Sequence, residues 1–189
     1  VMGALPNGVW IGKYFKKIDI REHGSKNSGA TNAYRVLGPK YGLIVLAADA
    51  LKGFLPPFIA SRYGVSGDML LLIGVLAIVG HSLSFFLHFK GGKGVATSLG
   101  VFLFLMPNVT LALLIVFILV VYFTRYISLG SIVAAAALPL LTALSPVGYG
   151  IGKTPLLVMT TLIGVFVIYR HRTNIKRLIE GTENKFKFK

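Results

Sequence analysis

Long runs of apolar residues, separated by short polar segments, dominate the chain. A helix needs about 20 residues to cross about 30 Å of hydrocarbon. Four runs meet or nearly meet that length: 43–60, 69–89, 127–144 and 155–169. A further apolar stretch, 95–123, is too long for one ordinary span, and Met106, Pro107 and Asn108 interrupt it. We therefore predict two short helices joined by a turn there.

The first residues, Val1 to Phe15, make up a partial span. The chain starts with Val rather than Met, so we expect an incomplete first membrane helix and not a signal peptide. Taken together, the pattern predicts an all-α polytopic membrane protein with seven transmembrane helices. We expect a single integral-membrane domain that covers 1–189.

Composition supports lipid as the main solvent of the chain. Apolar residues make up 54% of the sequence, and the mean hydropathy is +0.74, which a water-soluble domain of this size does not normally reach. The chain has no cysteine, which excludes disulfides, thiolate metal sites and a catalytic Cys. The net charge is +14, and the basic residues lie between apolar spans. We therefore expect anionic lipid and anionic substrates as partners and no nucleic acid.

The basic residues gather in alternate polar segments. One set of segments carries Lys13, Lys16, Lys17, Arg21, Lys26, Arg35, Lys40, Lys90, Lys93, Arg125 and the residues from Arg170 onward. The other set carries only Arg62 and Lys153. The positive-inside rule then predicts an outside N-terminus and a cytoplasmic C-terminus, provided that the break at Pro107 is a turn on the outer side.

The first basic segment combines small, hydroxyl and amide residues over 24–32 and then reads Ala-Tyr-Arg before a Gly38-Pro39 stop. This pattern predicts a loop that enters a short helix. Converging backbone N–H groups and the helix start favour an anion, and Thr31 and Arg35 share a helix face, so a phosphate could bind there. The alternative is a capped turn with ordinary solvated side chains. The spacing is not that of a P-loop.

The second basic segment, 89–97, places glycines around two lysines before a membrane helix. We interpret Lys93, inside the glycine cluster and at a helix start, as a phosphate ligand. Lys90 is better explained as a membrane anchor. His81 precedes this segment, and we weigh a direct role for it against the commoner role of a hydrogen-bonded packing residue.

The third basic segment, 169–183, is expected to continue the last span as a helix, with His171 and Asn174 on one face. Neighbouring arginines disfavour a protonated His171, so it could act as a neutral hydrogen-bonding group or as a base. The alternative is a basic helix on anionic lipid, which we expect for Lys176, Lys185, Lys187 and Lys189.

Three polar residues lie inside or beside the predicted spans. Ser128 follows Arg125 at the start of one span, where serines usually satisfy packing needs. Asp49 and Lys52 are three residues apart, and we expect a structural ion pair, because a lone charge in lipid is costly.

The three segments together resemble the three motifs of the bacterial acylphosphate-dependent glycerol-3-phosphate acyltransferases, known as PlsY. The resemblance covers essentially the whole chain. It is carried by Ser25, Asn27, 29–32 and Arg35 in the first motif, by Gly80, His81 and 89–97 in the second, and by Arg170, His171, Asn174, Ile175, Arg177 and Leu178 in the third. Two positions depart from the family pattern: Lys26 stands where glycine is common, and Ser84 where proline is usual.

The resemblance implies a seven-helix membrane enzyme of phospholipid synthesis in the bacterial cytoplasmic (inner) membrane, with a cytoplasmic active site. It implies transfer of a fatty acyl group from acyl phosphate to the first hydroxyl of glycerol 3-phosphate, which yields lysophosphatidic acid and phosphate, without direct use of acyl-CoA or acyl carrier protein. By position, Ser25, Arg35 and Lys93 would hold glycerol 3-phosphate. The residues Asn27, Thr31, His171 and Asn174 would complete the site, with Ser128 a weaker candidate; Lys93, His171 and Asn174 are the expected catalytic residues.

The residues themselves show no Ser-His-Asp arrangement among the 6 acidic positions, so we expect no covalent acyl-enzyme. We also expect no cofactor and no metal. Two other classes of protein fit short helices and cationic loops: a transporter or channel for an organic phosphate, and a non-catalytic membrane subunit that binds lipid head groups. The transporter is disfavoured because all the phosphate-competent clusters are predicted on one side of the membrane.

Overall fold

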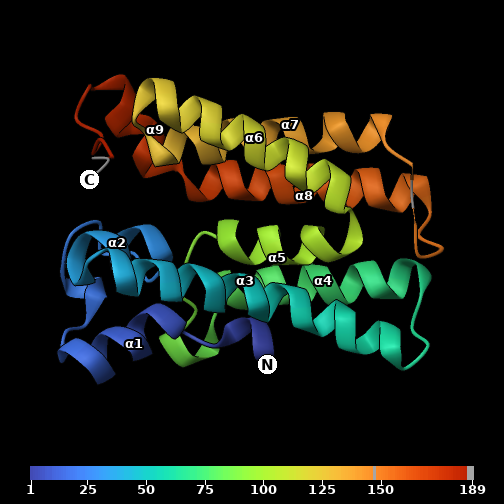
Figure 1. Cartoon of the computed structure of the whole chain (residues 1–189), viewed down its shortest axis with the longest axis horizontal. Helices are drawn as coiled ribbons and strands as arrows, with labels where there is room; N and C mark the ends of the chain where they lie inside the picture. The colour runs from blue at the N-terminus through green and yellow to red at the C-terminus, as the bar shows by residue number, and fades with distance from the viewer. Residues whose placement is uncertain (147, 187–189) are drawn as a thin grey trace. The chain divides into compact units, whose positions relative to one another are not determined.

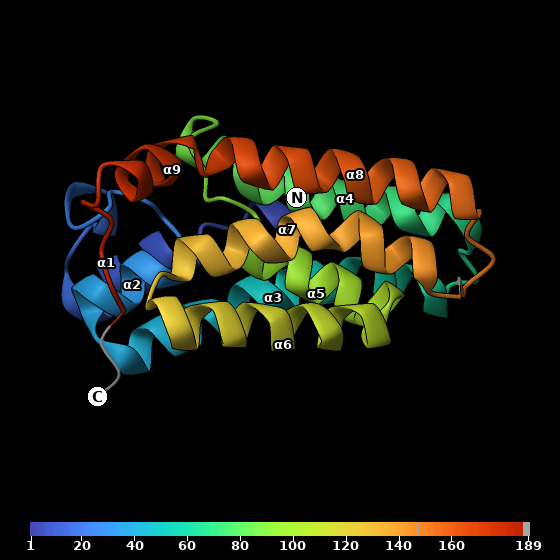
Figure 2. The same cartoon turned by 90° about the horizontal axis from the view of Figure 1, so that it is seen from above.

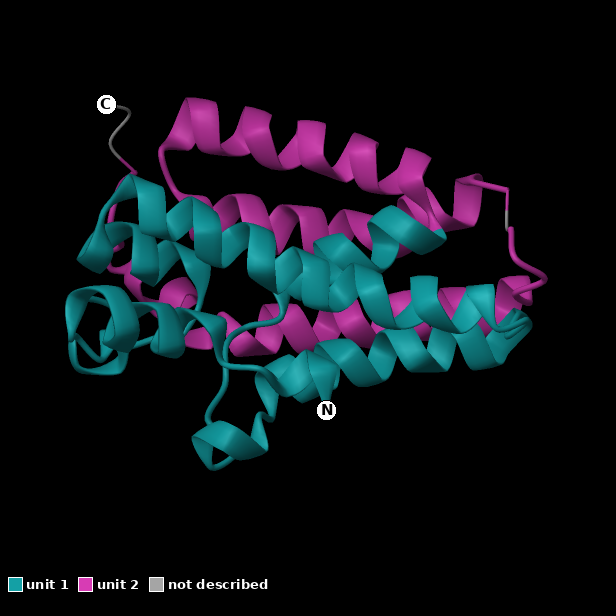
Figure 3. Ribbon diagram, turned by 60° about the horizontal axis from the view of Figure 1, so that its bottom comes forward, with its two compact units in different colours: residues 1–105 teal, residues 106–189 magenta. Residues whose placement is uncertain are grey.

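The computed structural model describes residues 1–146 and 148–186, and every regular element in these ranges is helical (Figures 1 and 2). The chain forms two compact units, unit 1 over Val1–Leu105 and unit 2 over Met106–Lys189 (Figure 3). Unit 1 contains η1 (Met2–Ala4), α1 (Asn7–Lys16), η2 (Ile20–Glu22), α2 (Ala30–Leu37), α3 (Pro39–Arg62), α4 (Gly67–Ser82), η3 (Phe85–Leu87) and α5 (Val95–Leu105). Unit 2 contains α6 (Pro107–Thr124), α7 (Ile127–Leu144), α8 (Lys153–Arg170) and α9 (Arg172–Ile179).

Among the described residues, 5 helical segments are long and apolar enough to cross a membrane. They are α3, α4 extended through η3, α6, α7 and α8, and they include the four runs expected from the sequence. The helix α5, with 11 residues, is apolar but shorter than a full span. The predicted interruption between α5 and α6 is confirmed, because α5 ends at Leu105 and Pro107 begins α6. Proline suits this position, since the first turn of a helix has no partner for its N–H groups.

The first expected span is not a single helix. η1 ends at Ala4 and α1 begins at Asn7, with Leu5 and Pro6 between them. Pro6 has a non-helical backbone at φ −89 and ψ 63, and it has no N–H to continue the hydrogen-bond ladder. The prediction of one partial helix over 1–15 was therefore wrong in this detail.

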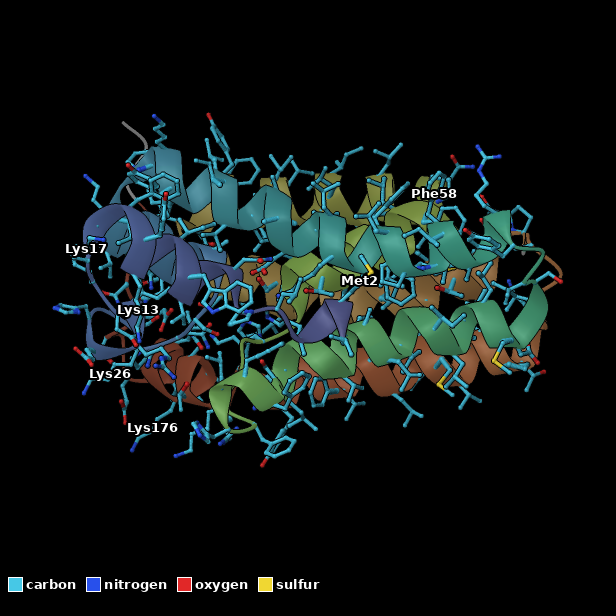
Figure 4. The ribbon with its side chains drawn as sticks, turned by 90° about the horizontal axis from the view of Figure 1, so that it is seen from below. Met2, Lys13, Lys17, Lys26, Phe58 and Lys176 are labelled. Atoms are coloured by element: carbon cyan, nitrogen blue, oxygen red, sulfur yellow. The ribbon has the colours of Figure 1, made fainter. Side chains whose placement is uncertain are left out.

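Unit 1 is built around close contact of α3 with its neighbours. A Cβ on Gly53 of α3 would lie 2.1 Å from the carbonyl oxygen of Thr97, and a Cβ on Gly100 of α5 would lie 1.8 Å from that of Ala50. The two helices can approach this closely only because both positions lack a side chain, which is a common way for helices to pack in lipid. Figure 4 shows Lys13, Lys17 and Lys26 at one end of this unit and Phe58 near the other.

In unit 2, α7 lies between α6 and α8 (Figure 2). Pro139 inside α7 removes the N–H that would bond the Ala135 carbonyl, and Gly164 of α8 packs against that carbonyl, 2.6 Å from a Cβ position. Lys153, at the start of α8, donates to the carbonyl oxygens of Thr142 and Ser145 at 2.7 and 2.5 Å. This ammonium group satisfies carbonyls at the C-terminal end of α7 that have no partner within the helix.

Candidate functional site

A buried asparagine organises the first basic segment. Asn32, 1% exposed, donates from Nδ2 to the backbone carbonyls of Ile20, His23 and Asn27 at 2.7, 3.2 and 2.9 Å. Its Oδ1 accepts from the backbone N–H of Ser25 at 2.8 Å. A buried amide with four hydrogen bonds fixes the loop before α2 in one conformation. The motif contained Asn32, but its residue type alone did not predict this central position.

The expected ligands of the first segment surround this loop. The side chain of Asn27 accepts from the backbone N–H of Gly29 at 2.9 Å, immediately before α2. The predicted short helix is confirmed as α2, with Gly29 as its N-cap, and it carries Thr31 in its first turn and the exposed Arg35 in its last turn. Ser25 is exposed. Polar groups from the loop and from the start of α2 therefore lie within a few residues of one another, in a segment held by the hydrogen bonds of Asn32.

An ion-pair cluster closes the other side of the same loop. Asp19 binds Arg21 at 2.6 Å and Lys13 at 3.2 Å. Hydrogen bonds from Arg21 outweigh the opposing effect of burial and, with Lys13, hold the pKa of the Asp19 carboxyl well below its usual range. Lys13 and Arg21 are thus engaged with an acidic partner inside unit 1.

The structure shows the backbone conformation or the hydrogen bonds of the two residues that depart from the family pattern, Lys26 and Ser84. Lys26 adopts a φ of 57°, in the left-handed region where glycine has no Cβ penalty. This conformation explains why glycine suits the position. Ser84 is buried and donates to the carbonyl oxygen of Ala4 at 2.5 Å, which ties the start of η3 to the N-terminal segment.

The second basic segment forms an extended loop before α5. Gly91 and Gly92 pack on His81: their Cβ positions would lie 2.0 Å from its carbonyl oxygen and 2.1 Å from its Nε2. Gly91 also donates to the carbonyl oxygen of Ser82 at 3.1 Å. Lys93 follows, half-buried, two residues before the first residue of α5. The loop therefore presents Lys93 beside a helix N-terminus, where orphan N–H groups and the helix dipole favour an anion.

The third basic segment is not a continuation of α8. The helix ends at Arg170, and a new helix, α9, starts at Arg172, with His171 between them. The expected uninterrupted helix was therefore wrong. At this break the Nδ1 of His171 contacts the carbonyl oxygen of Val167 at 2.8 Å, and a carbonyl can only accept a hydrogen bond. The proton is thus assigned to Nδ1, and in the neutral imidazole Nε2 is then an acceptor.

A buried glutamate brings the expected residues of unit 2 together. The Oε1 of Glu183 accepts from Ser128 Oγ at 3.0 Å and from Asn174 Nδ2 at 2.8 Å, and its Oε2 accepts from Arg177 Nε at 2.7 Å. The backbone N–H of Asn174 donates to the carbonyl oxygen of His171 at 2.8 Å. Burial raises the pKa of Glu183, but the hydrogen bonds from Arg177, Asn174 and Ser128 outweigh it and lower the pKa overall.

Sequence reasoning missed Glu183. The acidic residues were considered only as members of a Ser-His-Asp arrangement or, for Asp49, of an ion pair. Glu183 lies shortly after α9, which ends at Ile179. The available signal was the presence of acidic residues, Glu180 and Glu183, in a strongly basic segment, because a buried carboxylate needs basic partners. Lys187 and Lys189, expected to contact lipid, lie outside the described residues.

Asp49 and Lys52 form the expected ion pair. Their side chains are 2% and 5% exposed, and Lys52 Nζ lies 2.7 Å from Asp49 Oδ1. In the described part of the chain, no group of three or more His, Cys, Asp or Glu side chains could hold a metal ion.

The fold and these loops define an integral membrane protein with basic, glycine-containing polar segments at the ends of its helices. A family profile described as "Glycerol-3-phosphate acyltransferase" matches residues 1–181. The chain belongs to this family of membrane acyltransferases. Membership in an enzyme family replaces the transporter and the lipid-binding subunit as explanations of the motifs.

Relatives and solved structures agree with this assignment. The chain is 58% identical to a glycerol-3-phosphate acyltransferase of Fusobacterium nucleatum over 187 residues, which covers 99% of this chain and 94% of the relative. It is 46% identical to one of Bacillus subtilis over 190 residues, with 100% and 94% covered. Among solved structures, the glycerol 3-phosphate form of PlsY, an integral membrane glycerol 3-phosphate acyltransferase, matches with a TM-score of 0.89 at 41% identity, covering 98% of this chain and 90% of that one. The lysophosphatidic acid form matches with a TM-score of 0.86 at 40% identity.

Proposed function

We propose that this protein transfers a fatty acyl group from acyl phosphate to the sn-1 hydroxyl of glycerol 3-phosphate. The hydroxyl oxygen attacks the acyl carbonyl carbon, the bond from that carbon to the phosphate oxygen breaks, and lysophosphatidic acid and phosphate leave. Acyl phosphate is already an activated anhydride, so the protein needs mainly to bring two anions together and to stabilise the developing charge. Acyl-CoA and acyl carrier protein are not direct donors in this proposal.

The observation that carries the proposal is the glycine loop that ends in Lys93 at the start of α5. An ammonium group beside orphan backbone N–H groups suits a phosphate monoester. Arg35 and Ser25 complete the set that we assign to glycerol 3-phosphate. We assign Asn27, Thr31, His171 and Asn174 to the acyl phosphate and the reacting atoms.

Ser128 is the remaining candidate ligand. Ser128 remains the weaker ligand, because its hydroxyl already donates to Glu183.

We propose that both units serve one activity and that 1–189 is one functional domain. In the membrane we propose seven membrane helices, an outside N-terminus and a cytoplasmic C-terminus, in a bacterial inner membrane with the reaction on the cytoplasmic side. The distribution of basic residues supports this orientation.

The test is phosphate release from purified protein supplied with palmitoyl phosphate and glycerol 3-phosphate. We expect release that requires both substrates and continues in the presence of EDTA. Replacement of palmitoyl phosphate by palmitoyl-CoA should give no lysophosphatidic acid. Equal product from palmitoyl-CoA would contradict the assignment of the donor, and loss of turnover with EDTA would contradict the expectation that the reaction needs no metal.

The proton of the attacking hydroxyl has two possible acceptors, a substrate phosphate oxygen or the Nε2 of His171. We propose the phosphate, and we expect His171→Gln to retain turnover within about tenfold of the original rate. A general base contributes about 10²–10⁴ in rate, so a loss of that size with unchanged substrate binding would identify His171 as the base. Steady-state kinetics together with calorimetric binding of glycerol 3-phosphate separates the two outcomes.

A further inference from the structure

The buried charges of unit 1 form a chain of contacts that leads toward Lys93. The carboxylate of Asp49 is held at Oδ1 by Asn7 Nδ2 at 3.0 Å and by Lys52 Nζ at 2.7 Å. Lys52 also donates to the carbonyl oxygen of Leu5 at 2.6 Å. The side chains of Asp49 and Lys52 are 2% and 5% exposed, so the pair is buried inside unit 1.

Burying the charges of Asp49 and Lys52 costs desolvation free energy, so stability alone does not explain why this cluster is present. Replacing a buried ion pair by apolar residues of similar volume is often neutral or stabilising, and ionisable residues inside membrane segments generally serve function. Asp49 has a further neighbour besides the groups that hold it. Its Oδ1 lies 3.9 Å from Nδ1 of His81, whose side chain is 7% exposed. This distance is longer than a hydrogen bond, so the carboxylate acts on the ring through its charge, which favours a proton on the nearer Nδ1.

The opposite side of His81 carries the glycine loop. Its Nε2 would lie 2.1 Å from a Cβ on Gly92, and its carbonyl oxygen 2.0 Å from a Cβ on Gly91. The loop is thus packed on this residue without room for any side chain, and a rotation of the imidazole would displace the backbone that leads into Lys93. The imidazole of His81 and the backbone of Gly91 and Gly92 are therefore in close contact.

We propose that Asp49 is a positioning residue, which orients His81 and through it holds the 91–93 loop in the conformation that presents Lys93 to the substrate phosphate. The inference rests on the proposed function for the identity of that substrate. As a positioning residue, Asp49 acts through His81 and not by contact with a substrate. Asn7 and Lys52 fix the carboxylate from two elements, α1 and α3, so that the orientation of His81 is imposed by the packed helices.

The test compares Asp49→Asn, the charge-neutral pair Asp49→Asn/Lys52→Met, and Asp68→Asn as an exposed acidic control on α4. We expect both Asp49 variants to raise the KM for glycerol 3-phosphate by about tenfold with little change in kcat, because a misplaced binding group weakens substrate binding before it alters the chemistry. The control should keep the original KM. The double variant should keep the original Tm, since it leaves no unpaired buried charge.

A second readout is the ¹⁵N NMR spectrum of histidine-labelled protein, in which His81→Gln assigns one of the 4 histidines. We expect the His81 ring signals to shift toward a mixture of tautomers in Asp49→Asn. An original KM in folded Asp49→Asn, recovery of the original KM in the double variant, or failure of both variants to fold would each overturn the proposal. If the unmodified protein has no turnover, the proposed function fails instead, and the NMR comparison still decides whether Asp49 orients His81.

Discussion

Lys93→Ala is expected to lower kcat/KM for glycerol 3-phosphate by about two to three orders of magnitude. Truncating one partner of a desolvated charge pair costs about 2–5 kcal/mol, and Lys93 is half-buried beside a helix N-terminus where water competes weakly for the phosphate. The measurement is phosphate release from palmitoyl phosphate over a range of glycerol 3-phosphate concentrations. Circular dichroism of the purified variant establishes that the helices are intact.

Lys90→Ala is the matched control for this variant. Lys90 lies three residues earlier in the same loop and is exposed, and we assign it to the membrane surface. We expect it to change kcat/KM by less than a factor of about three, since an exposed charge contributes little. Equal losses in the two variants would mean that the loop supplies only a general positive potential and would remove Lys93 from the binding site.

Glu183→Gln is expected to destabilise unit 2 by about 3 kcal/mol and to remove most of the activity. The Glu183 side chain is 2% exposed, and its carboxylate accepts hydrogen bonds from Ser128, Asn174 and Arg177. In the Gln variant the N–H₂ group would face at least one of these donors, and the Arg177 charge would lose its partner. Thermal unfolding followed by circular dichroism gives the change in stability, and phosphate release gives the change in activity.

The pH dependence of this variant provides a separate check. The pKa of Glu183 is lowered in the folded protein, so its contribution to stability is complete above the usual carboxyl pKa of about 4.3 and is lost as the pH falls toward the lower folded value. The gap in Tm between the original protein and Glu183→Gln should therefore narrow on acidification. A gap that stays constant with pH would show that the charge of Glu183 is not what stabilises the site.

Glu180→Gln serves as the control for Glu183. Glu180 lies 3.8 Å from Lys176, and both side chains are well exposed. An exposed pair of this kind is worth about 0–1 kcal/mol, so this variant should unfold within about two degrees of the original protein. A large loss of stability here would indicate that α9 depends on its exposed charges and not on the Glu183 cluster.

The features that the sequence predicted well are those set by local pattern. The spans α3, α7 and α8 follow from apolar runs, the break before Pro107 follows from the chemistry of proline, and the start of α2 follows from a glycine and amide-rich loop. These depend on residues close together in the chain, where period and turn chemistry apply directly.

Some of the features that the sequence did not predict depend on contacts between residues far apart in the chain, and others depend on local contacts between a side chain and the backbone. Ser128 and Glu183 are 55 positions apart, and the apolar period of neither segment indicates that they meet. The break at His171 lies in a segment with good helix formers on both sides, and it accompanies a contact of the imidazole with the carbonyl of Val167. Asn32 belongs to the first motif, but its hydrogen bonds reach back across the loop as far as the carbonyl of Ile20, which the motif does not indicate.

The glycine contacts between α3 and α5 determine how unit 1 responds to its surroundings. Where Gly53 meets Thr97 and Gly100 meets Ala50, the helices are held by backbone atoms in van der Waals contact, without water to expel. This attraction does not depend on which hydrocarbon surrounds the helices. We therefore expect the packing of α3 against α5 to be the same in a bilayer and in a detergent micelle, so that kinetics of the solubilised protein refer to this arrangement of the two helices.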